Sequence, residues 1–191
     1  MRPPTCVFEN EKDRKLFVHK LELIINKGFT NLEIPWQDNS NWSDLMSEIR
    51  SKFPDINLGS ASVLNKQSID DSLKLNLNFS MMRFWDRNLF RYSTLNNYLL
   101  IPGICTHSNF QDAISLGCNI IKIYPIEKKE NALQIDKFNK KINFIAAGGL
   151  SITDIKKYKL RGYKAIVIGK KGFDGDVFDP NILKWANTSL N

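Results

Sequence analysis

Residues 117–125 read GCNIIKIYP, a short apolar run between glycine and proline that predicts a buried β-strand. Apolar residues occupy both alternating faces of this run, as is typical of a parallel sheet covered by helices. Lys122 lies in the middle, between Ile121 and Ile123. Because burial disfavours the charged ammonium, we expect a lowered pKa for this lysine and a side chain able to attack carbonyl carbons. The alternative is a structural lysine that reaches solvent or pairs with a carboxylate.

Short β-prone runs alternate with helical patterns on both sides of this strand. The predicted strands are residues 5–8, 29–34, 56–64, 77–82, 98–101, 117–125, 142–146 and 164–169. The predicted helices are residues 10–28, 38–53, 65–75, 86–96, 106–116, 131–138, 151–160 and 180–188. Eight such units favour an α/β fold of the (β/α)8 TIM-barrel type, as a single domain over residues 1–191. A flavodoxin-like open sheet is the alternative, but it normally uses five units.

The composition narrows the classes of protein. The sequence has no apolar run long enough to span a membrane and no apolar leader, so we expect no membrane association. Three cysteines without a CxxC pair fit a reduced, cytoplasmic protein, and two histidines leave little material for a metal site. The net charge of +7 is scattered over helical segments, which predicts no nucleic-acid binding. The same positive field suits a phosphorylated or carboxylated small substrate.

Barrel enzymes place their active sites at the carboxyl ends of the strands, so polar residues there are the candidates. These candidates are Glu33, Ser62, Lys122, Gly148, Gly149, Gly169, Lys170 and Lys171. Glu33 lies between Leu32 and Ile34 and is therefore expected to be buried, with Lys122 as its partner. A purely structural ion pair is the alternative. The glycines after the last two strands predict a phosphate-binding backbone, although simple turns use the same residues.

Five short motifs in order make the chain resemble the 2-keto-3-deoxy-6-phosphogluconate (KDPG) and 4-hydroxy-2-oxoglutarate (KHG) aldolases over nearly its whole length. They are LEIPWQ (32–37), GSASVL (59–64), IPGICT (101–106), KIYP (122–125) and AGGL (147–150). The resemblance implies a class I aldolase that needs no metal or cofactor and cleaves a 2-keto-3-deoxy sugar acid, phosphorylated or not, or 4-hydroxy-2-oxoglutarate, to pyruvate and an aldehyde. Lys122 would form a Schiff base, Glu33 would move protons, and Tyr124 would lie against the imine. The family is commonly trimeric, which implies a possible homotrimer.

The sequence departs from the family pattern around the substrate rather than at the lysine and glutamate. Gln37 replaces the arginine that binds the keto-acid carboxylate, Ser62 replaces a threonine, Met82-Arg83-Phe84 replaces Ser-Pro-Gly, Ala147 replaces a threonine, and Lys170-Lys171 replaces Gly-Ser. Glutamine cannot make a bidentate charged contact, so we expect weaker binding at the carboxylate end unless Arg83 supplies the missing cation. These changes predict either an altered substrate range or a weakened enzyme.

Two other functions remain open from the sequence. A non-catalytic member of the family would keep the glycine loops and bind a phosphorylated ligand without turnover. Another phosphate-binding barrel enzyme, such as an epimerase or a relative of thiamine-phosphate synthase, would need an Asp/His or Asp/metal group at the strand ends, and the sequence offers no such group.

Overall fold

The computed structural model describes residues 11–126, 141–174 and 177–189, in which helices and strands alternate along the chain. The helices are α1 (Glu11–Ile25), α2 (Ser40–Lys52), α3 (Lys66–Lys74), α4 (Arg87–Leu95), α5 (His107–Ser115), α7 (Ile155–Leu160) and α8 (Pro180–Ser189), with the 3₁₀ turns η2 (Ile152–Asp154) and η3 (Lys170–Gly172). The strands are β1 (Asn31–Pro35), β2 (Asn57–Val63), β3 (Phe79–Met82), β4 (Leu100–Ile101), β5 (Gly103–Ile104), β6 (Ile120–Ile123), β7 (Asn143–Leu150), β8 (Ala165–Ile168), β9 (Phe173–Asp174) and β10 (Val177–Phe178).

The main strands pair in parallel in the orders β1-β2-β3-β4 and β5-β6-β7-β8. The two sheets meet at Pro102, which separates β4 from β5 and whose carbonyl oxygen accepts the Lys122 amide at 2.9 Å. Because proline has no N–H to give to a ladder, one strand is here divided into two. The predicted strand 98–101 is therefore too short at its carboxyl end.

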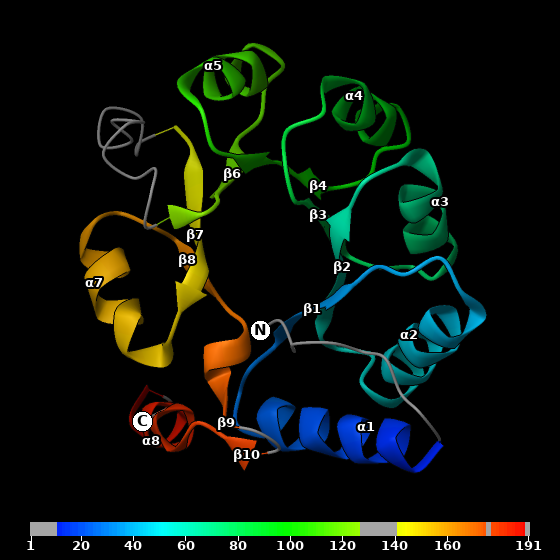
Figure 1. Ribbon diagram of the computed structural model, residues 1–191, viewed down its shortest axis with the longest axis vertical. Helices are drawn as coiled ribbons and strands as arrows, with labels where there is room; N and C mark the ends of the chain where they lie inside the picture. The colour runs from blue at the N-terminus through cyan, green and yellow to red at the C-terminus, as the bar shows by residue number, and fades with distance from the viewer. Residues whose placement is uncertain (1–10, 127–140, 175–176, 190–191) are drawn as a thin grey trace.

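Helices surround the strands on the outside of the molecule (Figure 1). The chain thus has the predicted α/β class and a TIM-barrel-like arrangement, and its described strands exceed the five of the flavodoxin-like alternative. The predicted strand 5–8 and helix 131–138 lie outside the described residues. Among the residues described, no helix is both long and apolar enough to cross a lipid bilayer.

Four consecutive helices begin at polar side chains that cap their first turns. Asn39, Asn65, Asp86 and Thr106 precede α2, α3, α4 and α5, and each side chain accepts a hydrogen bond from a backbone N–H in the first turn. Such caps satisfy donors that have no partner within the helix, so they determine where each helix starts. Each helix therefore begins directly after the loop that follows a strand end.

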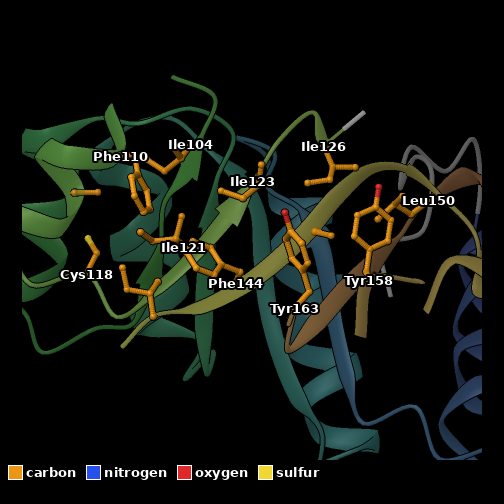
Figure 2. Packing of buried hydrophobic residues seen from close by; sticks show 13 residues of the cluster. Ile104, Phe110, Cys118, Ile121, Ile123, Ile126, Phe144, Leu150, Tyr158 and Tyr163 are labelled. Atoms are coloured by element: carbon orange, nitrogen blue, oxygen red, sulfur yellow. The ribbon is translucent and has the colours of Figure 1, made fainter. Parts of the chain in front are cut away.

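Successive side chains along each strand point alternately to an outer core, between the strands and the helices, and to the inside of the barrel. The outward face of β5 to β8 packs against α5 and α7, and Figure 2 shows Ile121 and Ile123 in this cluster with Phe110 and Phe144. A second outer cluster holds Leu32 and Ile34 against α1 and α2. The inward face carries a smaller apolar cluster of Phe79, Met81, Ile101 and Ile145. Residues between the outward-facing ones are therefore directed into the barrel.

Two strands carry irregularities at their carboxyl ends. The β2–β3 register shifts between Ala61 and Val63, and the β7–β8 register shifts between Ala147 and Leu150. The predicted strand 142–146 therefore continues further than expected, through Gly148 and Gly149. Such bulges re-aim side chains and backbone groups at the rims of barrels, where the site is expected.

Candidate active site

Lys122 faces the interior because both of its strand neighbours face outward. Ile121 and Ile123 are fully buried in the outer cluster, and Figure 2 shows them packed on that side. Alternation then directs the Lys122 side chain into the barrel, where it is 3% exposed. The sequence prediction of a buried lysine in this strand is confirmed.

Glu33 is placed by the same rule on the opposite sheet. Leu32 and Ile34 pack outward, and Glu33 points inward with 3% exposure. Neither of its carboxylate oxygens accepts a hydrogen bond from the described part of the chain. A buried carboxylate without such partners is costly, and it is the kind of group that an active site retains for its chemistry.

These two side chains share one pocket at the carboxyl ends of the strands. Its volume is about 270 Å³, and the described residues that line it are Glu33, Arg83, Lys122, Tyr124, Ala147, Gly148, Gly149, Val167, Gly169 and Lys170. Most of the residues expected from the sequence are thus brought together, from β1, β6, β7 and the segment after β8. Val167 was missed, although its alternation with Ala165 in β8 would have placed it on the inward face.

Three expected substrate-binding residues are not among the described residues that line this pocket: Gln37, Ser62 and Lys171. The Gln37 Oε1 atom instead accepts a hydrogen bond from Asn39 Nδ2, at 3.3 Å, at the start of α2. Ser62 lies in the β2 bulge with a φ of 57°, a left-handed conformation that changes the direction of its side chain. Lys171 is exposed in η3, next to Lys170.

Tyr124 provides the aromatic wall of the pocket. The Lys122 Nζ atom lies 6.0 Å from the centroid of the Tyr124 ring, which places the amine over an electron-rich face. On its other side Tyr124 is near Phe84, with ring centroids 6.4 Å apart. The Lys122 amine therefore lies near the face of an aromatic ring that lines the same pocket.

The β7 bulge brings backbone close to the chain that follows Lys122. Gly148 has a φ of +116°, and a Cβ atom built on it would lie 3.2 Å from Pro125 Cα. The positive φ strains any residue other than glycine, and the close approach leaves little room for a side chain. Gly148 and Gly149 consequently present backbone rather than side chain to the pocket, as an anion-binding loop does.

Positive charge exceeds negative charge around the pocket. Among the described residues that line it, Arg83, Lys122 and Lys170 accompany one carboxylate, that of Glu33. This imbalance favours anionic ligands. Within the described ranges, no three His, Cys, Asp or Glu side chains come together in a way that would hold a metal ion.

Glu33 also borders a second cavity, of about 470 Å³, inside the barrel. Phe79, Met81 and Ile145 are among the apolar residues that line it. Glu33 therefore lies between a polar pocket at the carboxyl ends of the strands and a mainly apolar cavity nearer their amino ends.

The fold and the pocket define a TIM-barrel-like protein with an interior lysine at the carboxyl ends of its strands. A family model described as KDPG and KHG aldolase matches residues 4–181, so the chain belongs to this family. The predicted family resemblance is confirmed. No protein of curated function matches the sequence.

Solved structures of low sequence identity share the fold. A KDPG aldolase from Legionella pneumophila with pyruvate captured as a covalent carbinolamine is 19% identical, with a TM-score of 0.75 over 99% of this chain and 89% of that one. A KDPG aldolase from Zymomonas mobilis with 3-phosphoglycerate is 19% identical, with a TM-score of 0.77 over 97% and 88%. A phosphoribosylanthranilate isomerase from Thermotoga maritima is 12% identical, with a TM-score of 0.64 over the full length of both chains. Since an isomerase shares the barrel, the fold alone does not select the reaction.

Proposed function

We propose that this protein is a class I aldolase that cleaves KDPG or 4-hydroxy-2-oxoglutarate to pyruvate and an aldehyde. One observation carries the proposal: a buried lysine and a buried carboxylate line the same small pocket, with Tyr124 beside the amine. A nucleophilic lysine and a proton-transferring acid are the two groups that Schiff-base cleavage requires. Membership of the aldolase family supports the same reaction class.

The proposed reaction begins with attack of the Lys122 amine on the C2 carbonyl of the substrate. The resulting carbinolamine loses water and becomes an iminium ion, whose positive nitrogen withdraws electrons from C3. In the Legionella relative, pyruvate is captured as a carbinolamine, the first of these intermediates. Tyr124 would support the cation that forms at the nitrogen, because an aromatic face attracts positive charge.

Cleavage then breaks the C3–C4 bond. The bonding electrons move into the iminium to give an enamine, while the C4 hydroxyl loses its proton to Glu33, directly or through a water molecule, and leaves as an aldehyde carbonyl. A proton is returned to C3 of the enamine, and water hydrolyses the imine to release pyruvate and the free lysine. Glu33 can serve as base and acid in turn because it has no fixed partner among the described residues.

The far end of the substrate would lie against the β7 and β8 ends. Gly148, Gly149 and Gly169 offer backbone, and Lys170 adds a cation, which together suit a phosphate or a second carboxylate. The Zymomonas relative, whose structure contains 3-phosphoglycerate, supports a phosphorylated ligand for this kind of pocket. We therefore propose a small anionic keto acid as the ligand class.

The second candidate is a non-catalytic family member that binds a phosphorylated ligand. The observation that favours it is the position of Gln37, which is uncharged and lies outside the described lining of the pocket. Loss of a charged carboxylate contact would weaken keto-acid binding without affecting the phosphate end.

Borohydride trapping tests the proposal. The protein is incubated with pyruvate and sodium borohydride, and the adduct is located by peptide mass mapping. We expect a reduced adduct on Lys122, none on Lys122→Ala, and a normal adduct on Lys74→Ala, which removes an exposed lysine of α3. An unlabelled native protein at high pyruvate would contradict the proposal. Release of pyruvate from a substrate panel then separates an aldolase from a protein that binds but does not cleave.

A metal-dependent barrel enzyme is the remaining outcome. Activity that survives Lys122→Ala and requires a divalent metal would favour that class over both candidates.

A further inference from the structure

We propose that Arg83 binds the carboxylate of the keto acid in this chain, on the side of Lys122 opposite to the Lys170 loop. The inference deepens the proposed function and rests on it. It assigns the pocket two separate anion-binding positions, with the reactive amine between them.

The backbone of Arg83 is fixed close to the strand that neighbours Lys122. Gly103 of β5 pairs with Lys122 of β6 in the parallel register. A Cβ atom built on Gly103 would lie 2.3 Å from the Arg83 carbonyl oxygen and 2.7 Å from that of Met82. The segment that follows β3 therefore crosses directly over Gly103, in space that any other residue would fill. This crossing brings Arg83 beside the reactive strand.

Arg83 is an exposed residue at the edge of the same pocket. It lines the pocket together with Lys122, and its guanidinium carbon lies 5.5 Å from the centroid of the Phe84 ring. Phe84 in turn is near Tyr124. In the part of the chain that the structure describes, no carboxylate forms an ion pair with Arg83. The guanidinium thus stacks on an aromatic ring and retains its hydrogen-bond donors for a ligand.

The strand order assigns the two ends of the substrate. Arg83 follows β3 of one sheet, whereas Lys122 is on β6 and Lys170 follows β8 of the other, so Arg83 and Lys170 reach the pocket from different sheets. The carboxylate of a 2-keto acid is one bond away from the carbon that reacts with lysine and must lie beside Nζ. The glycine loops and Lys170 occupy the β7–β8 side, where they suit the distant anionic group.

Arginine is also suited chemically to this end of the substrate. Its planar guanidinium makes two parallel hydrogen bonds to a carboxylate, a geometry that an amide such as that of Gln37 does not reproduce. The preferred substrates are therefore 2-keto acids with a second anionic group several carbons away. A 2-keto compound whose carboxylate is masked loses the Arg83 contact and keeps the remainder of the site.

Pyruvate and its neutral methyl ester test the assignment. The fraction of protein trapped by borohydride is measured against the concentration of each compound for the native protein, Arg83→Gln and Arg83→Lys. We expect Arg83→Gln to raise the half-saturating pyruvate concentration about 10- to 100-fold, the effect of losing a charged hydrogen bond, and to leave methyl pyruvate unchanged. For Arg83→Lys we expect a half-saturating pyruvate concentration between those of the native protein and Arg83→Gln, because a lysine keeps the charge and loses the bidentate geometry.

Arg91→Gln is the matched control, since it removes the same charge from an exposed position on α4. It is expected to behave as the native protein with both compounds. Equal losses for pyruvate and methyl pyruvate in Arg83→Gln would overturn the inference, as would equal losses in Arg91→Gln.

A failure of the proposed function is distinguishable from a failure of this inference. If the native protein forms no adduct, the Schiff-base proposal fails, and pyruvate binding is then measured by calorimetry on Lys122→Ala and on Lys122→Ala/Arg83→Gln. Tighter binding to the first of these two proteins supports the Arg83 contact without any covalent step. Equal binding, or none by either, overturns it.

Discussion

Gly59 and Phe79 are in direct contact across neighbouring strands: a Cβ atom built on Gly59 would lie 2.5 Å from the Phe79 ring. Gly59 pairs with Glu33 in the β1–β2 register, so the ring occupies the space that a side chain would take beside the buried carboxylate. Phe79 and Glu33 also line the same interior cavity. Because position 59 has no side chain, the apolar Phe79 ring can pack next to the Glu33 position.

Replacing Gly59 by alanine tests this contact. The added methyl group overlaps the Phe79 ring, so we expect Gly59→Ala to lower the free energy of unfolding by about 1–2 kcal/mol. Phe79→Leu removes the overlapping ring atoms. In urea titrations the double variant Gly59→Ala/Phe79→Leu should therefore lose less stability than the two single variants lose together. Strictly additive losses would contradict the contact.

Glu33 is expected to reduce stability while it supports catalysis. Both of its carboxylate oxygens are buried and accept no hydrogen bond from the described residues. Glu33→Gln replaces this buried carboxylate by a neutral amide that costs less to bury, so we expect the free energy of unfolding to rise by about 1 kcal/mol and pyruvate release to fall about 10²- to 10⁴-fold. Thermal unfolding and a turnover assay on the same preparation provide the two measurements.

Glu48→Gln is the control for that substitution. Glu48 pairs with Arg14 at 2.7 Å near the surface, so its replacement should slightly lower stability and leave turnover unchanged. The hypothesis of an activity–stability conflict at Glu33 fails if Glu33→Gln is less stable than the native protein.

Neighbouring lysines after β8 should differ in their effect on substrate binding. Lys170 lines the pocket, whereas Lys171 is exposed and is not among the described lining residues. Lys170→Gln is expected to raise KM for a phosphorylated substrate about 10-fold and to leave kcat nearly unchanged, because the lost contact is made equally in the bound and transition states. Lys171→Gln removes the same charge one residue away and should leave KM unchanged. Equal changes of KM in the two variants would indicate that the positive potential of the whole region, rather than a direct Lys170 contact, attracts the substrate.

The Cys118 thiol should resist alkylation in the folded protein. Burial, with a smaller contribution from Asp112, raises the pKa of this thiol from an ordinary value of 9.0 to about 12. Since the thiolate is the reactive form, iodoacetamide at pH 9 should modify the half-buried Cys105 faster than Cys118, and urea should remove the difference. Peptide mass mapping over time measures both rates.

The same raised pKa makes stability depend on pH. Between about pH 9 and pH 12 the unfolded chain releases the Cys118 proton and the folded chain keeps it, so the free energy of unfolding falls as the pH rises through this window. Cys118→Ala should show a smaller fall between pH 8 and pH 10.5 than the native protein. An identical pH dependence in the two proteins would contradict the assignment.

The sequence predicted the positions of Lys122 and Glu33 because a local rule determines them. Each lies between two apolar residues of a strand, and alternation directs it inward once those neighbours pack outward. Helix starts were also predicted well, because a cap such as Thr106 or Asp86 acts on the first turn that follows it.

Features that depend on the path of a loop were not predictable in the same way. Gln37 follows β1 and Ser62 lies near the end of β2, but a turn toward α2 and a bulge in β2 take them away from the described lining of the pocket. The β9–β10 hairpin was missed because its paired segments are two residues each, which is too short for a periodic pattern. Arg83 was recognised only as a candidate cation, since its position over Gly103 is a contact between residues distant in sequence.

Two of the cations that line the pocket, Arg83 and Lys170, lie outside the strands that form the barrel. Arg83 comes directly after β3, and Lys170 comes two residues after β8, whereas Ile121 and Ile123 remain inside the packed framework. Positions 83 and 170 can therefore be varied without changing the strands. Other charged or polar residues at these two positions should change which anionic substrates bind, while the packing of the barrel stays the same.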